Sequence, residues 1–154
     1  MRKYIKYGAY AVLGLGLVAS GAIAQQVMHN NQSNTRSPFA SSVMVPAGYD
    51  TYYVSGKSGK GADTATQTAD CLENLKAELA SQGLTFGDVV QAHVFLVGAN
   101  GGKMDFAGMN SSWFKVFGTA DQPNKPARAA FQVAALAGAD NLVEIEFIAV
   151  KKAR

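Results

Sequence analysis

The chain contains very few of the residues that form disulfides and metal sites. Among its 154 residues are one cysteine, Cys71, and two histidines, His29 and His93. A single cysteine excludes an intrachain disulfide, even for a protein exported to an oxidising compartment. The histidines have no metal-ligand spacing with Cys71 or with acidic residues, so we expect no metal site. Cys71 lies beside a leucine in a helical pattern, and we expect a core thiol rather than a nucleophile.

An excess of positive charge is also missing once the first residues are set aside. The formal net charge is +3, but Arg2, Lys3 and Lys6 account for all of it. The chain after residue 24 has eleven basic and eleven acidic residues, so its formal net charge is zero. Proteins that bind nucleic acid usually concentrate lysine and arginine on one surface. We therefore expect no nucleic-acid partner.

The first 24 residues have the pattern of a secretory signal peptide. A basic start, MRKYIK, precedes the apolar stretch YGAYAVLGLGLVASG, and Ala22 and Ala24 occupy the two small positions of a cleavage site. We expect cleavage after Ala24, export to the periplasm, and no membrane attachment afterwards. The alternative is an uncleaved membrane anchor, because residues 7–24 are just long enough to span a bilayer.

The rest of the chain divides into a short polar segment and one domain. Residues 25–37, QQVMHNNQSNTRS, have no hydrophobic pattern, and we predict a flexible tether there. Residues 38–154 are enough for a single domain with a substantial core.

Hydrophobic periodicity within the domain alternates between that of strands and that of helices. Strands are predicted near 43–45, 52–56, 88–97, 127–136 and 142–150, and helices over 64–82 and from the capping residue Asp105 to about 118. The order predicts an α+β two-layer domain, a mixed sheet with two helices on one face. Because the last strand has apolar residues on both faces, we expect another subunit to cover the second face.

Three charged residues lie inside predicted strands. Arg128 lies in the strand at 127–136, and Glu144 and Glu146 lie on one face of the last strand because they are two residues apart. One explanation is that these charges face solvent and protect a sheet edge from aggregation. The other is that they line a binding site. The pattern alone favours the first explanation.

A resemblance to a known family favours the second. The stretch KPARAAFQVAALAG followed by VEIEFIAV resembles the C-terminal signature of the RidA family (reactive intermediate deaminase A, also called YjgF). YYVSG, ADCLENLKAELASQGLTFGDVVQAHVFL and MDFAGMNSSWFKVFG are similar to its other segments in order and spacing, so the resemblance covers about residues 37–152. It implies a chorismate-mutase-like fold and homotrimers with a site in each cleft between subunits. It also implies hydrolysis of enamines and imines, such as 2-aminoacrylate and 2-iminobutanoate, to 2-keto acids and ammonia without a cofactor.

The same resemblance assigns roles to individual residues. Arg128 would bind the substrate carboxylate, since a planar guanidinium forms bidentate, charge-assisted pairs with carboxylates. Glu144 would hold and activate the attacking water. The remaining substrate-binding residues would be Asn110, Ser55, Gly56 and Phe39.

A second function stays open because the chain departs from the family pattern at two positions. Phe39 stands where the family's deaminases usually have tyrosine, and Ala130 stands where they often have cysteine. The presence of both Arg128 and Glu144 favours a deaminase. Phe39 and the predicted export favour a non-catalytic binding module, which would capture a small carboxylate or a protein partner in the same cleft.

Overall fold

The computed structural model describes residues 25–30, 37–99 and 102–154. The predicted signal peptide, residues 1–24, and its cleavage site therefore lie outside the described residues. Within the described ranges, no helix is long and apolar enough to cross a membrane. The same ranges contain no group of three or more His, Cys, Asp or Glu side chains that could hold a metal ion.

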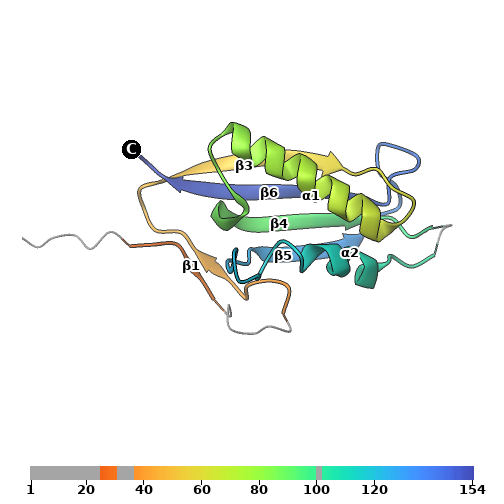
Figure 1. Cartoon of the computed structure of the whole chain (residues 1–154), viewed down its shortest axis with the longest axis horizontal. Coiled ribbons are helices and arrows are strands. Elements are labelled where there is room, and N and C mark those ends of the chain that lie inside the picture. Colours follow the sequence, from red (N-terminus) through yellow and green to blue (C-terminus); the bar gives the residue numbers. More distant parts are fainter. Residues whose placement is uncertain (1–24, 31–36, 100–101) are drawn as a thin grey trace, which may run out of the picture.

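A four-stranded sheet with two helices on one face forms the body of the domain (Figure 1). The elements in chain order are β1 (Met28–His29), β2 (Val43–Met44), β3 (Tyr49–Ser58), α1 (Thr64–Ser81), the 3-10 helix η1 (Phe86–Asp88), β4 (Val89–Leu96), α2 (Phe106–Trp113), β5 (Ala127–Gln132) and β6 (Val143–Lys152). The sheet order is β3-β6-β4-β5, with β4 and β5 parallel and the other neighbours antiparallel. The predicted α+β two-layer architecture with a mixed sheet is confirmed.

The first helix forms as its sequence predicts. The Asp63 carboxylate accepts a hydrogen bond from the backbone N–H of Thr66 at 2.7 Å, within a capping box. Gly83 follows the helix with a φ of +67°, a left-handed conformation that suits glycine after a helix end. The leucines of the buried face are Leu72, Leu75 and Leu79. This face covers β3 and β6 and closes one side of the core.

The second helix is shorter than predicted. Asp105 caps it, as expected, by accepting from the Gly108 N–H at 2.8 Å. Regular helix ends at Trp113 because the chain then tightens into i→i+3 bonds, such as Val116 N–H to Trp113 O at 3.0 Å. Met109 and Trp113 are buried in the core, whereas the first apolar residue of the helix, Phe106, is 41 % exposed.

Two strands also differ in length from the prediction. The strand predicted over 127–136 ends at Gln132, because its partner β4 ends at Leu96, the residue paired with Gln132. In contrast, β3 extends over 49–58 because β6 pairs with nearly all of it. Strand length here is therefore set by the partner strand rather than by the local hydrophobic pattern.

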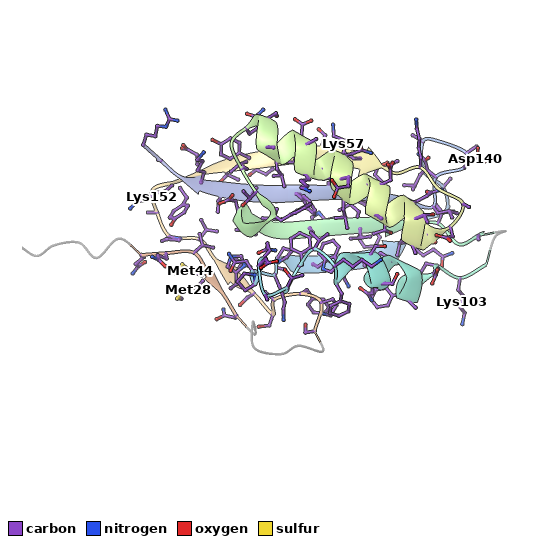
Figure 2. The ribbon with its side chains drawn as sticks, viewed as in Figure 1. Met28, Met44, Lys57, Lys103, Asp140 and Lys152 are labelled. Carbon is purple, nitrogen blue, oxygen red and sulfur yellow. The ribbon has the colours of Figure 1, made fainter. Side chains whose placement is uncertain are left out.

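The prediction of a tether over 25–37 is wrong for Met28 and His29. These residues form β1, which pairs antiparallel with β2 and places Met28 beside Met44 (Figure 2). The ring Nδ1 of His29 also donates a hydrogen bond to the backbone oxygen of Lys125 at 2.8 Å. The polar sequence concealed this strand because backbone pairing and one side-chain bond hold it, and neither produces a hydrophobic pattern.

The sheet face opposite the helices, here called the open face, combines apolar and charged side chains. Tyr53 is 81 % exposed and Phe131 is 41 % exposed. The rings of Phe131 and Phe95 meet edge to face with centroids 5.0 Å apart. Exposed aromatic rings on both edge strands of one sheet face are typical of a face that contacts another molecule.

Candidate functional site

Arg128 lies on the helix side of the sheet. In the parallel pairing of β4 and β5 it is opposite Ala92, which is buried beneath the helices. The carbon Cζ of its guanidinium is 4.6 Å from the centroid of the Trp113 ring. Two further rings, Phe39 and Phe106, have centroids 5.5 and 5.7 Å from the same atom. Three aromatic rings from separate parts of the chain therefore surround this one cation.

No carboxylate pairs with Arg128 among the residues that the structure describes. Its guanidinium instead donates to the sulfur of Met109 at 3.6 Å, and a thioether is a weak acceptor. Burial lowers the pKa of the Arg128 guanidinium to about 10, because desolvation disfavours the charged form. The group stays protonated at neutral pH, and cation–π contacts and the weak bond to Met109 are what compensate its burial among the described residues. It is therefore available to pair with an anion.

Asn110 lies on the side of α2 that faces this cation. Residues three and four apart on a helix are neighbours, and Phe106 and Trp113 stand at those distances on either side of Asn110. Both of those rings contact Arg128. The side-chain oxygen of Asn110 is buried and accepts no hydrogen bond within the described residues. Such an unsatisfied acceptor costs about 1–3 kcal/mol, which a ligand N–H could recover.

Glu144 lies on the opposite face of the sheet. Its neighbours Val143 and Ile145 are fully buried under the helices, so the alternation of the strand turns Glu144 to the open face. There it is paired with Phe95 in β4 and with Ser58 in β3. Its Oε2 accepts a hydrogen bond from the Ser58 hydroxyl at 3.3 Å.

Ser55 and Gly56 form an irregularity in β3 beside Glu144. Between Val54 and Lys57 the strand has one residue more than its partner β6, which is the geometry of a β-bulge. A Cβ atom on Gly56 would overlap Oε1 of Glu144 and would lie 3.1 Å from its Cδ. Glycine is therefore required for this carboxylate to lie against the strand. Ser55 is exposed next to it.

The predicted site residues thus form two groups on opposite faces of one sheet. We call Arg128, Phe39 and Asn110 the arginine group, and Glu144, Ser55 and Gly56 the glutamate group. Strand β4 separates the strands of Arg128 and Glu144, a lateral distance of roughly 10 Å. The two groups cannot contact one small molecule within a single chain. A common cleft would need the arginine group of one chain and the glutamate group of another.

Sequence analysis missed two contributors to the arginine group. The sequence patterns gave Trp113 and Phe106 no role in the site, but both rings contact Arg128. The indole N–H of Trp113 also donates to the backbone oxygen of Pro38 at 2.7 Å, which fixes the residue before Phe39. The spacing of Phe106, Asn110 and Trp113 on one helix face was the signal that could have identified them.

Glu146 shares the face of Glu144, as predicted, but has a different partner. Its Oε1 accepts a hydrogen bond from His93 Nδ1 at 2.7 Å. The other ring nitrogen of His93 lies 2.9 Å from the side-chain nitrogen of Gln91. Glu146 therefore belongs to a separate polar network along the open face, apart from the glutamate group.

Two other features lie apart from both groups. A cavity of about 410 Å³ is lined by the N-terminal segment and the ends of β3 and β6, and includes none of the six predicted site residues. Cys71 is buried, and its thiol donates to the backbone oxygen of Lys57 at 2.8 Å. Burial raises the pKa of the Cys71 thiol to about 12, so the prediction of a core thiol is confirmed.

The chain is similar to known proteins over most of its length. Residues 29–151 match a family described as Endoribonuclease L-PSP. A 2-iminobutanoate/2-iminopropanoate deaminase of Escherichia coli is 38 % identical over 100 residues, which are 64 % of this chain and 73 % of that protein. A RutC family protein of Haemophilus influenzae is 41 % identical over 91 residues, or 59 % of this chain and 66 % of that one. Protein DfrA of Myxococcus xanthus is 34 % identical over 137 residues, 83 % of this chain and 97 % of that protein.

Solved structures share the fold. The YjgF gene product of E. coli is 32 % identical, with a TM-score of 0.55 over 70 % of this chain and 84 % of that one. A protein of the conserved Rid family from Yersinia pestis, YyfB, is 25 % identical, with a TM-score of 0.63 over 82 % of this chain and 98 % of that one. The two-layer arrangement of helices and mixed sheet is therefore the fold of these proteins.

The substitution Gly56→Ala tests the close approach of Glu144 to β3. We expect it to destabilise the fold by about 1 kcal/mol at most, because the new methyl group overlaps only the end of the flexible Glu144 side chain, which can turn away. In a Glu144→Ala background the overlapping atoms are gone, and the cost should fall below half of that value. Urea unfolding at one fixed protein concentration measures both costs. Equal costs in the two backgrounds would show that the carboxylate does not lie against Gly56.

Proposed function

The chain belongs to the Endoribonuclease L-PSP family, and from that premise we propose that it hydrolyses small 2-imino and 2-enamino acids to 2-keto acids and ammonia. The observation that supports this most directly is Arg128, a desolvated guanidinium without a carboxylate partner among the described residues. Such a group is suited to bind the carboxylate that all these substrates share. The 38 % identity to a 2-iminobutanoate/2-iminopropanoate deaminase supports the same chemistry.

In the proposed reaction, Arg128 and Glu144 have separate tasks. Arg128 binds the substrate carboxylate through two parallel N–H···O bonds and fixes the position of C2. Glu144 orients a water and takes a proton from it as the water oxygen bonds to C2 of the protonated imine. Glu144 passes that proton to the nitrogen of the resulting carbinolamine. As the C–N bond breaks and ammonia leaves, the hydroxyl proton returns to Glu144 and the C–O bond becomes the C=O bond of the 2-keto acid. The buried oxygen of Asn110 is available to accept an N–H of the substrate.

The site is complete in this proposal only in a homotrimer. The arginine and glutamate groups lie on opposite faces of one sheet, so a rotation that brings unlike faces together can place them in one cleft. Repeating that contact around a threefold axis gives a closed ring. Contact between chains would also remove the exposed rings of Tyr53 and Phe131 from water.

We also propose that the protein is exported, with residues 1–24 removed as a signal peptide. The support is the sequence pattern that ends at Ala24. The alternative, an uncleaved membrane anchor, would leave the same domain attached to a bilayer.

A second candidate function is a non-catalytic binding module that uses the same cleft. It is favoured by Phe39, whose ring lies near Arg128 but has no hydroxyl to donate to a substrate nitrogen or a water. This module would still bind small 2-keto carboxylates through Arg128.

Substitutions at the two charges distinguish these functions. Arg128→Ala should weaken carboxylate binding and turnover together, by roughly the 2–5 kcal/mol of a broken buried charge pair. Glu144→Gln keeps the shape but removes the base, so it should retain 2-keto acid binding and lose turnover by roughly 10²–10⁴-fold. Ammonia release from freshly generated 2-iminobutanoate and calorimetric titration with 2-ketobutanoate measure the two effects.

Glu146→Gln is the matched control, because it lies on the same strand face but pairs with His93. It should alter binding and turnover by no more than about twofold. Binding without hydrolysis in the wild type would favour the binding module. An unchanged Arg128→Ala variant would mean that the arginine group is not the site.

The oligomeric state is measurable by light scattering of the protein without residues 1–24. We expect about three times the monomer mass. Phe131→Glu should shift the protein toward monomer, because it replaces an exposed ring of the open face, which we expect to be buried between chains, with a charge. A wild type that is monomeric at micromolar concentration would refute the trimer and, with it, the shared cleft.

N-terminal sequencing of the protein recovered from its native host tests export. We expect a start at Gln25 in the soluble periplasmic fraction. Recovery of Met1 in the membrane fraction would instead establish the anchor.

A further inference from the structure

The guanidinium of Arg128 contacts aromatic rings and makes no ion pair within the described residues. The neighbours of its guanidinium are the rings of Phe39, Phe106 and Trp113 and the sulfur of Met109. Trp113 has no exposed surface, so its ring packs against the buried side of the cation and cannot contact a ligand. Phe106 is 41 % exposed and Phe39 is half-buried, so both keep ring surface that another molecule can contact.

A carboxylate bound by Arg128 brings the rest of its molecule close to these rings. In a bidentate pair the carboxylate carbon lies about 4 Å from the guanidinium carbon. The ring centroids lie at 4.6–5.7 Å from that same carbon. The first carbons of a 2-imino acid side chain follow the carboxylate by only two bonds, so they lie at a comparable distance. A side chain that turns toward the exposed rings of Phe39 and Phe106 can therefore pack along or between them.

We propose that the arginine group selects 2-imino acids with aromatic or other bulky apolar side chains over those with small or charged ones. The inference rests on the proposed function, because it names the substrate class of the same site. Apolar side chains gain from contact with the rings of Phe39 and Phe106, since that contact removes hydrocarbon from water. A charged substrate side chain would lose its hydration beside the rings and find no ion-pair partner in the arginine group, because Arg128 is already bound to the substrate carboxylate. An acidic substrate side chain would also be repelled by Glu144 in the shared cleft.

The test compares four imines generated in the assay by an L-amino-acid oxidase from phenylalanine, leucine, alanine and glutamate. We expect kcat/KM for the phenylalanine-derived imine to exceed that for the alanine-derived imine by roughly tenfold or more, as for apolar groups that fill a hydrophobic pocket. The leucine-derived imine should fall between them, and the glutamate-derived imine should be slowest.

A pair of phenylalanine substitutions, one at the first residue of α2 and one just after its last residue, supplies the matched control. Phe106→Ala removes an exposed ring that contacts Arg128, whereas Phe114→Ala removes a ring of nearly equal exposure, 41 % against 42 %, that has no such contact. Phe106→Ala should reduce the phenylalanine-to-alanine ratio of kcat/KM severalfold, and Phe114→Ala should preserve it. Because the ratio compares two substrates on one preparation, partial misfolding of a variant does not change it.

The inference and the proposed function fail in different ways. Hydrolysis of all imines with no preference for the aromatic one, or with the small one preferred, overturns the inference and leaves the deaminase intact. If no imine is hydrolysed, the deaminase fails, and calorimetric titration with phenylpyruvate and pyruvate decides the inference alone. The inference is supported if phenylpyruvate binds more tightly than pyruvate and if Phe106→Ala reduces this difference. Equal affinities, or no binding of either acid, overturn the inference.

Discussion

The Trp113 side chain joins the three parts of the molecule that make the arginine group. Its ring stacks on Phe117 in the core, with centroids 4.5 Å apart, and lies beneath the guanidinium of Arg128. Its N–H is bonded to Pro38, so the segment that presents Phe39 is held against the same ring. A buried indole satisfies its single donor and still offers a flat, electron-rich surface. The position of Arg128, which has no ion-pair partner among the described residues, is thereby fixed by the packing of the core.

Alternation along the strands sets a second constraint on function. Each strand directs successive side chains to opposite faces, and this puts Arg128 under the helices and Glu144 on the open face. No rotamer change can bring the two together across the sheet. Chemistry that uses both groups therefore depends on association between chains, so the assembly and the site are linked in one equilibrium. The bulge at Ser55 and Gly56 completes the glutamate group by bringing the backbone against the carboxylate.

Much of the fold could be predicted from the sequence because burial leaves a local pattern. The period of α1 and the alternation of β4 identified both elements to within two residues, since each has one apolar face against the core. The failures depend on partners far away in the chain. Gln132 ends β5 only because β4 stops there, and Met28 pairs with Met44 through backbone bonds that leave no signature. The contacts of Phe106 and Trp113 with Arg128 also join distant segments, and only their spacing with Asn110 on one helix face was visible in the sequence.

The pairing of β1 with β2 shortens the free stretch of chain between the domain and any segment that precedes residue 25. A free segment over 25–37 could extend to roughly 45 Å, but with Met28 paired to Met44 only residues 25–27 remain before the fixed point, a reach of roughly 10 Å. His29 is bonded to Lys125, immediately ahead of the strand that bears Arg128. If the N-terminal segment stays in a membrane, the domain is held close to the lipid surface with a restricted orientation. The arginine group would then keep a defined orientation relative to the bilayer.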